Sequence, residues 1–378
     1  MTSPSTARRA AGDGETRTQL EATSGADAAD GAVPSAEADG APAGAGPDGA
    51  GQLVASPPEA LERAAALVAP ALEAAVARLC PELAPVVEHH MQAGGKRVRA
   101  ALAVLSAEAV GAPPEEALVG AVAVELVHNF SLIHDDVVDG DTERRHRRTV
   151  WIEFGLGPAV VAGDALAALA TELLLEDPTP PRVRAALCLT RATAAMIAGQ
   201  AQDMAFERRQ QVSVEDCRAM EAAKTGALLA CASSIGAILA GAADPVVEAL
   251  ADYGNHLGMS FQAVDDVLGI WGRPEVTGKP VGSDLLAHKK TLPIVLAMDG
   301  LPAGVLRRVS ALLAGDLSAG GVAAVFELLE HQGACAAALD FALEHREQAL
   351  AALRRVPLVE GPAAELAAVA RYVTERDR

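Results

Sequence analysis

Three carboxylates lie close together in one short stretch of the sequence, at Asp135, Asp136 and Asp139, directly after an apolar run over residues 121–133. On a helix, residues four apart project from one face, so these carboxylates repel one another. A like-charge pair about 4 Å apart costs roughly 4 kcal/mol at an effective dielectric constant of about 20. A divalent cation removes that cost, and Mg²⁺ prefers carboxylate oxygens while sharing its ligand shell with substrate phosphates.

Arginines follow the three carboxylates at once, at Arg144, Arg145, Arg147 and Arg148. Guanidinium groups match the geometry of phosphate oxygens and bind them in pairs. The acidic and basic clusters together predict a site for Mg²⁺ and a diphosphate. For the DDxxD motif taken alone, a solvated and charged helix end is an equally good interpretation.

A second acidic pair, Asp265 and Asp266, also stands at the end of an apolar stretch that favours a helix. Gln262 precedes the pair on the same predicted helix face, and Lys279 follows it in the segment TGKPVGSD. Two acidic helix ends that face each other across a bundle can hold Mg²⁺ around one diphosphate. The repeated pattern therefore strengthens the prediction of a metal–diphosphate site.

Two further basic motifs flank these acidic pairs. The segment GGKRVR places Lys96 and Arg99 three residues apart, and its glycines let the backbone approach an anion closely. The segment KTG begins with Lys224, a lone cation that opens an otherwise apolar helix. Both motifs add candidate phosphate ligands.

The composition favours helices and excludes some classes of function. Hydrophobic residues make up 51% of the 378-residue chain but aromatic residues only 3%, which favours helices over strands. The net charge of −19 argues against nucleic-acid binding. No CxxC spacing occurs among the five cysteines, which we interpret as reduced thiols of a cytoplasmic protein. These cysteines are Cys80, Cys188, Cys217, Cys231 and Cys335.

Two regions of different character divide the chain. Residues 1–55 are rich in Ala, Gly and Pro, and up to Ala50 they hold three Arg against eight Asp or Glu, so we expect an acidic disordered tail. Residues 56–378 read as successive helices punctuated by Gly and Pro, which predicts one all-α bundle with a central cavity. The uncharged stretch 225–243 is the one candidate membrane span, and its small residues favour a buried helix instead.

Taken in order, GGKRxR, DDxxD followed by RR, GQxxD, KTG, FQxxDD and GK resemble the motifs of the trans-polyprenyl diphosphate synthase family. The resemblance extends from about Ser56 to the C-terminus. It implies the isoprenoid synthase fold and a reaction in which an allylic diphosphate ionises between the two acidic motifs. The C4 carbon of isopentenyl diphosphate then attacks the allylic cation, and a proton leaves.

The resemblance also implies a role for each matching residue. Mg²⁺ is bound by Asp135, Asp136, Asp139 and Asp265, with Gln262 and Asp266 nearby. The allylic diphosphate is bound by Arg144, Lys224, Gln262 and Lys279. Isopentenyl diphosphate is bound by Lys96, Arg99, His128 and Arg145. The developing allylic cation is faced by Thr225 and Gln200.

The sequence departs from the family pattern at several positions. Gly269 stands where the second acidic motif usually has a third aspartate, and Asp284 is a candidate substitute for that metal contact. Ala100 replaces a common proline, His146 replaces a common glycine, and Arg148 stands where proline is frequent. These last three departures have no explanation in the sequence itself.

Five other polar residues receive expectations from their context. Lys289 and Lys290 are expected to be a solvated pair, and His89 and His90 are expected to be surface residues. Asp203 is equally well interpreted as a pocket residue or as a polar partner for an arginine.

The resemblance further implies a homodimer and a pocket floor that sets product length. Phe130 lies five residues before Asp135, where the family places a large side chain below the metals. One helical turn rises about 5.4 Å, near the length of one five-carbon unit. An aromatic floor beside the small Ser131 predicts a short product, C20 first and C15 second.

Alternatives stay open at this point. A terpene cyclase of the same fold takes no second diphosphate, and the GGKRVR segment with His128 and Arg145 argues against it. A non-catalytic regulatory subunit should have lost acidic residues. Only Gly269, which stands where the family usually has an aspartate, argues for this alternative. A third alternative is a cargo or scaffold protein in which the tail carries the function.

The tail carries a second resemblance. The motifs RRHRRTVW and DDVLGIWG behind a long Ala/Gly/Pro-rich tail resemble actinobacterial polyprenyl transferases packaged as cargo inside encapsulin shells. That resemblance implies docking of short islands such as residues 18–20 and 52–54 on the shell. The simpler interpretation is a solvated appendage.

Overall fold

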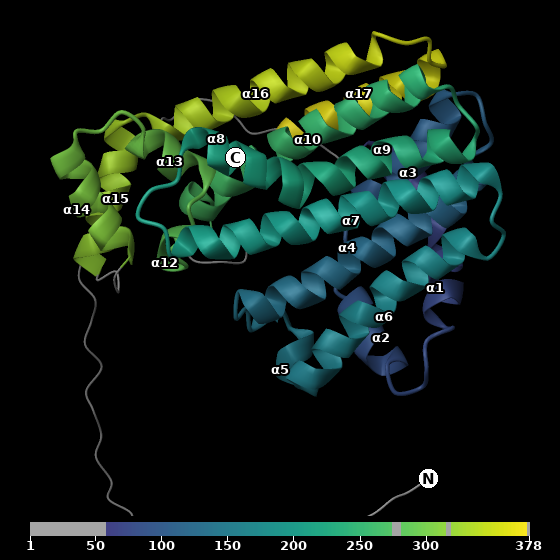
Figure 1. Cartoon of the computed structure of the whole chain (residues 1–378), viewed down its shortest axis with the longest axis horizontal. Coiled ribbons are helices and arrows are strands. Elements are labelled where there is room, and N and C mark those ends of the chain that lie inside the picture. The colour runs from purple at the N-terminus through teal and green to yellow at the C-terminus, as the bar shows by residue number, and fades with distance from the viewer. Residues whose placement is uncertain (1–57, 274–280, 315–318, 376–378) are drawn as a thin grey trace, which may run out of the picture. The chain divides into compact units, whose positions relative to one another are not determined.

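Helices account for nearly all of the regular structure in the computed structural model, which describes residues 58–273, 281–314 and 319–375 (Figure 1). The predicted disordered tail, residues 1–55, and Lys279 lie outside the described residues. The prediction of an all-α bundle is confirmed.

The helices follow one another through short connections, as the Gly and Pro punctuation predicts. The first half contains α1 (Glu59–Val76), α2 (Ala84–Met91), α3 (Val98–Ala109), η1 (Pro114–Ala117), α4 (Leu118–Val138), α5 (Val150–Phe154), α6 (Leu156–Leu175) and α7 (Pro180–Glu207). The second half contains α8 (Val214–Glu221), η2 (Ala222–Gly226), α9 (Ala227–Leu239), α10 (Asp244–Trp271), α12 (Ser283–Leu286), α13 (Leu292–Met298), α14 (Ala303–Ala314), α15 (Ala319–His331), α16 (Ala334–Leu353) and α17 (Glu360–Glu375).

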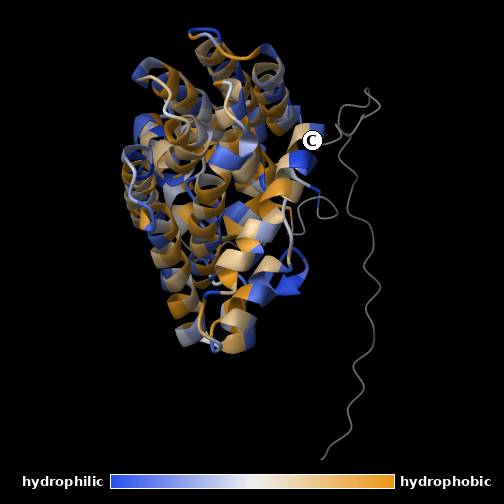
Figure 2. Ribbon diagram, turned by 90° about the vertical axis from the view of Figure 1, so that its right-hand side faces the viewer, coloured by the Kyte–Doolittle hydropathy of each residue, from blue (hydrophilic) through white to orange (hydrophobic). Residues whose placement is uncertain are grey.

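A core of small residues brings the central helices together. Nine of the 12 residues of α3 are buried, and α3 packs against α4, α9 and α17. A Cβ atom at Gly236 of α9 would lie 2.0 Å from the Ala103 carbonyl oxygen of α3, so only glycine allows this approach. Figure 2 shows hydrophobic stretches along the helices throughout the bundle. Ala and Gly thus position the long helices α4 and α10, which end at the two acidic motifs.

One short hairpin interrupts the helices, a feature that the sequence did not predict. Strand β1 (Glu143–Arg144) pairs antiparallel with β2 (Arg147–Arg148), with Glu143 opposite Arg148 and Arg144 opposite Arg147. The hairpin follows α4 directly, so it holds the arginine cluster beside the first acidic motif.

More helices are apolar than the sequence indicated. By length and hydropathy, residues 114–138, 156–175 and 214–239 each reach the range of a membrane span, and the bent pair 320–331 and 334–353 does so jointly. The expectation that only residues 225–243 look like a span is therefore wrong. In the first and third stretches, 61% of the most apolar window is buried, so packing within the bundle uses much of this surface.

Candidate active site

The first acidic motif sits at the carboxyl end of α4. Asp135 and Asp136 lie in its last turn, and Asp139 caps it. Asp136 is 1% exposed in its side chain and accepts a hydrogen bond of 2.6 Å from Nε of Arg144. Burial raises the pKa of Asp136 to about 6 even beside this arginine. Burial also raises the pKa of Asp135. The cluster therefore contains buried carboxylates whose mutual repulsion a bound cation would reduce.

The hairpin is held by α2 and by an unusual backbone. Arg145 and His146 form its turn with φ of 52° and 61°, a left-handed region that favours glycine. The positive φ explains why glycine is common at position 146, and His146 adopts this backbone conformation at a cost in strain. Nε2 of His89 on α2 donates to the carbonyl oxygen of Arg148 at 2.8 Å, which fixes the second strand.

The glycine loop fits around Arg145. A Cβ atom at Gly95 would lie 2.8 Å from Nη1 of Arg145, so the absence of a side chain at this position makes room for the guanidinium group. Burial lowers the pKa of Arg145, as expected for a cation withdrawn from water. The loop and the hairpin together place two cationic segments at one site.

The second acidic motif lies near the end of α10, and its two aspartates differ. Asp266 is 4% exposed, accepts from Nε2 of Gln262 at 2.7 Å and accepts from the backbone N–H of Leu292 at 2.9 Å. Gln262 Oε1 in turn accepts from the hydroxyl of Thr225 at 2.7 Å. Burial raises the pKa of Asp266 to about 7. Asp266 therefore orients Gln262 and Leu292, and both Asp265 and Asp266 line the polar pocket.

Asp284 occupies the space left by Gly269. A Cβ atom at Gly269 would lie 2.1 Å from Oδ2 and 2.5 Å from Cγ of Asp284. The hydroxyl of Ser283 donates to the carbonyl oxygen of Gly269 at 3.2 Å, which ties the two segments together. A carboxylate from α12 thus fills the position in which a third aspartate of α10 would start.

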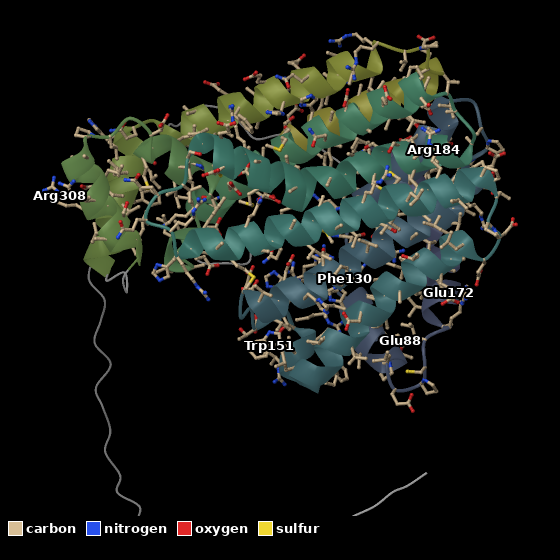
Figure 3. The ribbon with its side chains drawn as sticks, viewed as in Figure 1. Glu88, Phe130, Trp151, Glu172, Arg184 and Arg308 are labelled. Atoms are coloured by element: carbon tan, nitrogen blue, oxygen red, sulfur yellow. The ribbon has the colours of Figure 1, made fainter. Side chains whose placement is uncertain are left out.

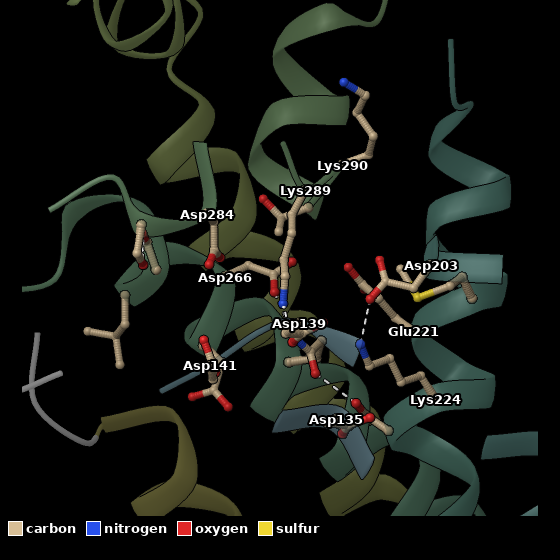
Figure 4. Close-up of a pocket in the computed structure, with 18 of the residues that line it drawn as sticks. Asp135, Asp139, Asp141, Asp203, Glu221, Lys224, Asp266, Asp284, Lys289 and Lys290 are labelled. Carbon is tan, nitrogen blue, oxygen red and sulfur yellow. Dashed lines mark hydrogen bonds and ion pairs between the residues drawn. The ribbon is translucent and has the colours of Figure 1, made fainter. Parts of the chain in front are cut away.

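Two lysines reach the pocket already paired with carboxylates (Figure 4). Nζ of Lys224 donates to Asp203 at 2.5 Å, and Nζ of Lys289 donates to Asp139 at 2.9 Å. Burial acts to lower the pKa of Lys289, but Asp139, Asp284 and Asp203 together outweigh burial and raise it. Of the two interpretations of Asp203, the pocket residue is confirmed, although its partner is a lysine.

Two expectations about surface residues are wrong. Lys289 bridges toward the first acidic motif, and Lys290 is 4% exposed, so burial lowers the pKa of Lys290. His90 is 7% exposed, and burial lowers its pKa to about 4. His90 lies on α2, which packs against α4, α5 and α6, and local spacing does not encode such contacts between distant elements.

Two adjoining cavities meet at these residues. A polar pocket of about 530 Å³ lies between both acidic motifs, and a larger cavity of about 910 Å³ continues toward Phe130. Lys96 lines both. Further residues common to both linings are Asp135, Arg144, Lys224, Thr225, Gln262 and Asp265. The large cavity is lined as well by Arg99, His128, Arg145 and Gln200. The predicted site residues within the described ranges therefore line this pair of cavities, except Asp136, which is buried beside Arg144.

The contacts of Ala100, which follows the GGKRVR segment, explain why this position departs from the common proline. The backbone N–H of Ala100 donates to Oε1 of Glu125 at 3.0 Å, a bond that proline cannot make. Burial raises the pKa of Glu125. Nη1 of Arg99 lies 3.2 Å from Nε2 of His128, and burial followed by Arg99 lowers the pKa of His128 well below its usual value. His128 is therefore a neutral imidazole that accepts from Arg99.

Phe130, labelled in Figure 3, lies on α4 and lines the large cavity. Its ring meets the His134 ring edge-on with centroids 4.9 Å apart, and Nε2 of His134 donates to the carbonyl oxygen of Val160 at 3.0 Å. A Cβ atom at Gly163 would lie 2.2 Å from Nε2 of His134, so α6 admits this imidazole only through glycine. The Phe130 ring is thus held through His134, which contacts α6.

Glu221 is a pocket residue that the sequence analysis missed. Its side chain is buried, it lines the polar pocket, and the thiol of Cys217 donates to its Oε1 at 3.4 Å. Burial and then Asp266 raise the pKa of Glu221. Glu221 stands three residues before Lys224, and residues three apart share a helix face, so the sequence could have predicted Glu221 in the pocket.

Comparison with known proteins agrees with this geometry. The family model for polyprenyl synthetase matches residues 80–315. The chain belongs to the polyprenyl synthetase family. This confirms the resemblance drawn from the motifs.

Relatives of this polyprenyl synthetase cover most of its length. It is 46% identical over 328 residues to a (2E,6E)-farnesyl diphosphate synthase of Mycobacterium tuberculosis, covering 82% of this chain and 90% of the relative. It is 43% identical over 252 residues to a geranylgeranyl diphosphate synthase of the same organism, covering 63% and 72%. The crystal structure of a polyprenyl synthetase from Streptomyces coelicolor superposes with a TM-score of 0.78 at 47% identity, covering 83% of this chain and 98% of that one.

Proposed function

We propose that this polyprenyl synthetase is a short-chain trans-prenyltransferase that condenses isopentenyl diphosphate with an allylic diphosphate. The observation that carries the proposal is the polar pocket between the two acidic motifs, which adjoins a larger cavity lined by Phe130. Relatives named farnesyl and geranylgeranyl diphosphate synthase support the same reaction class.

The residues of the polar pocket suit Mg²⁺. Oδ2 of Asp136 is buried and has no hydrogen-bond partner within the described ranges, an arrangement that costs free energy unless a ligand fills it. We assign Asp135, Asp136, Asp139 and Asp265 as metal ligands, with Asp284 in the position next to Gly269. Bound Mg²⁺ supplies positive charge that stabilises the departing diphosphate.

The chain's own cations complete the allylic half of the site. Arg144, Lys224 and Lys289 line the polar pocket, where the diphosphate leaves with the electron pair of its C–O bond. Fixed cations stabilise that developing charge without reorganising during the reaction. Lys279, assigned to the same diphosphate by resemblance, lies outside the described residues. Lys289 is an additional assignment that rests on its position in the pocket.

Neutral oxygen atoms face the other end of the broken bond. Oε1 of Gln200 is buried in the large cavity without a hydrogen-bond partner in the part of the chain described, and Thr225 lines both cavities. Their dipoles stabilise the allylic cation while the C4 carbon of isopentenyl diphosphate forms the new C–C bond and a proton leaves. Lys96, Arg99, His128 and Arg145 hold the second diphosphate, which distinguishes elongation from cyclisation.

Incubation with isopentenyl diphosphate, Mg²⁺ and dimethylallyl, geranyl or farnesyl diphosphate tests this function, with products separated by chain length. We expect C20 as the main product and C15 second. The Asp135→Asn variant is the matched control and should lose about 10²- to 10³-fold in turnover while remaining folded. Absence of a chain-elongated product from the wild-type protein with every primer would refute the proposal.

The two diphosphate sites can be separated by matched lysine variants. Lys96→Ala should raise KM for isopentenyl diphosphate far more than KM for the allylic primer, and Lys224→Ala should disturb the allylic half. Equal effects of Lys96→Ala on both substrates contradict the assignment.

A homodimer is part of the proposal. Apolar side chains are exposed on α6 and α7. Soluble monomers rarely expose a large contiguous apolar surface, so these side chains are candidates for an interface. This α6/α7 surface comprises Leu156, Val160, Val161, Leu175, Val183 and Leu187. Burial of this surface against a second copy removes it from water and supports the dimer that the resemblance implies.

The tail is proposed as a docking segment for an encapsulin shell in the cytoplasm. Support comes from its composition and from the motif resemblance alone, because residues 1–55 lie outside the described part of the chain. Deleting residues 1–55 should leave activity in solution nearly intact and abolish co-purification with the shell. Capture of the truncated enzyme by the shell leaves the solvated appendage as the better interpretation.

A further inference from the structure

An aromatic ring from the last helix holds a cation of the candidate site. Nζ of Lys96 lies 4.9 Å from the centroid of the Tyr372 ring on α17. Tyr372 is only 5% exposed, so its ring is fixed by the core, whereas Lys96 is exposed in the glycine loop and lines both cavities. A cation within about 6 Å of a ring face is attracted to the ring.

Lys96 is held by an aromatic ring, whereas three neighbouring cations are held by carboxylates. Lys224 pairs with Asp203, Lys289 pairs with Asp139, and Arg144 pairs with Asp136. Lys96 has no carboxylate within ion-pair distance among the described residues. A ring restricts where the ammonium group points but leaves its full charge for an anion, since it brings no opposite charge.

The ring is anchored to the same helix that carries the second acidic motif. The hydroxyl of Tyr253 on α10 donates to the carbonyl oxygen of Leu366 on α17 at 2.7 Å. Tyr372 lies six residues further along α17, about 9 Å at 1.5 Å per residue. Val369 and Val373 beside it are buried, so α17 is held firmly where it presents the ring.

We infer that Tyr372 is a positioning residue for Lys96 and therefore helps to determine the affinity for the second diphosphate, that of isopentenyl diphosphate. The inference rests on the proposed function in one respect, the identity of that diphosphate. Tyr372 touches no reacting atom and acts only by limiting the positions of the Lys96 ammonium group.

The test compares substitutions at the only two tyrosines of the chain. Tyr372→Leu removes the aromatic face and should raise KM for isopentenyl diphosphate about two- to thirtyfold, with the allylic KM unchanged. Tyr372→Phe keeps the face and should retain wild-type KM. Tyr253→Phe tests the anchor of the ring: it removes the hydroxyl bond to Leu366 that holds α17, so it should raise KM for isopentenyl diphosphate in the same direction but by less than Tyr372→Leu.

A double variant distinguishes coupling from general damage. In the Lys96→Gln background, Tyr372→Leu should add no further rise in KM for isopentenyl diphosphate, because the cation that it positions is absent. An additive effect, or equal KM changes for both substrates in Tyr372→Leu, overturns the inference.

Should Tyr372→Leu fail to fold, fluorinated phenylalanines at position 372 keep the ring size and weaken its face. Affinity for isopentenyl diphosphate, measured by calorimetry without turnover, should then fall with each added fluorine. An affinity independent of fluorination overturns the inference. Absence of product from the wild-type enzyme refutes the proposed function instead, so the two failures are distinguishable.

Discussion

Buried charge at the first acidic motif makes metal binding depend on pH. The pKa of Asp136 is raised to about 6 by burial, so its proton must leave before the carboxylate can bind Mg²⁺. We expect the apparent affinity for Mg²⁺ to fall as pH falls from about 8 to about 5, with proton release on binding near pH 6. Calorimetry in two buffers of different ionisation enthalpy measures that release.

The raised pKa of Asp136 also determines how the stability of the fold changes with pH. A carboxyl with a pKa higher in the folded than in the unfolded state stabilises the fold at low pH, and this contribution is lost as pH rises through about 6. Asp136→Asn removes the titration and serves as the control for both measurements. Identical proton release in Asp136→Asn contradicts the assignment of this titration to Asp136.

Gly269 and Asp284 should behave as one unit. Gly269→Asp alone places a side chain where Asp284 already lies, so we expect weaker Mg²⁺ binding and lower turnover. Combining it with Asp284→Gly restores one carboxylate in that space and should recover much of the lost affinity. Metal affinity by calorimetry and kcat measure the effect, and a double variant that is worse than both single variants contradicts this view.

At the scale of elements, Phe130 on α4 is predicted to limit product length. Phe130→Ala removes the ring that rests against His134 and deepens the large cavity, so products should lengthen by at least one five-carbon unit. Product chain length after extended incubation measures this. The control Phe154→Ala removes an exposed ring on α5, and an unchanged distribution in Phe130→Ala places the floor elsewhere.

The turn between β1 and β2 should store strain at His146. Its φ of 61° suits glycine, so His146→Gly should raise the free energy of unfolding by about 0.5–1 kcal/mol. His146→Ala keeps the strained backbone and is the matched control. Thermal or denaturant unfolding measures both variants, and equal stability of the two variants argues against backbone strain.

Elements with local signals could be predicted from the sequence, and contacts between distant elements could not. Asp135, Asp136 and Asp139 are neighbours on one helix, so their spacing alone places them together. The pair of Lys289 and Asp139 spans 150 residues, and no local pattern encodes it, which is why Lys289 was wrongly expected in solvent. The hairpin was missed because its turn uses arginine and histidine in place of glycine.

At the scale of the whole molecule, the α6/α7 surface is predicted to be the dimer interface. Leu187 is 51% exposed on this surface, and Leu187→Glu buries a charge in the dimer, so association should weaken strongly. Leu312→Glu changes a side chain that is 40% exposed on α14 and is the control. Sedimentation at micromolar concentration distinguishes monomer from dimer, and a wild-type monomer contradicts the dimer.

The ion pair between Lys289 and Asp139 has a consequence for how ligands bind in the polar pocket. We expect Mg²⁺ bound to Asp139 to release the lysine for phosphate, and phosphate bound to Lys289 to release the aspartate for Mg²⁺. Each ligand would then remove a competitor of the other, so we expect metal and diphosphate to bind with positive cooperativity. Linkage requires the effect to be reciprocal: the factor by which Mg²⁺ tightens diphosphate binding equals the factor by which diphosphate tightens Mg²⁺ binding.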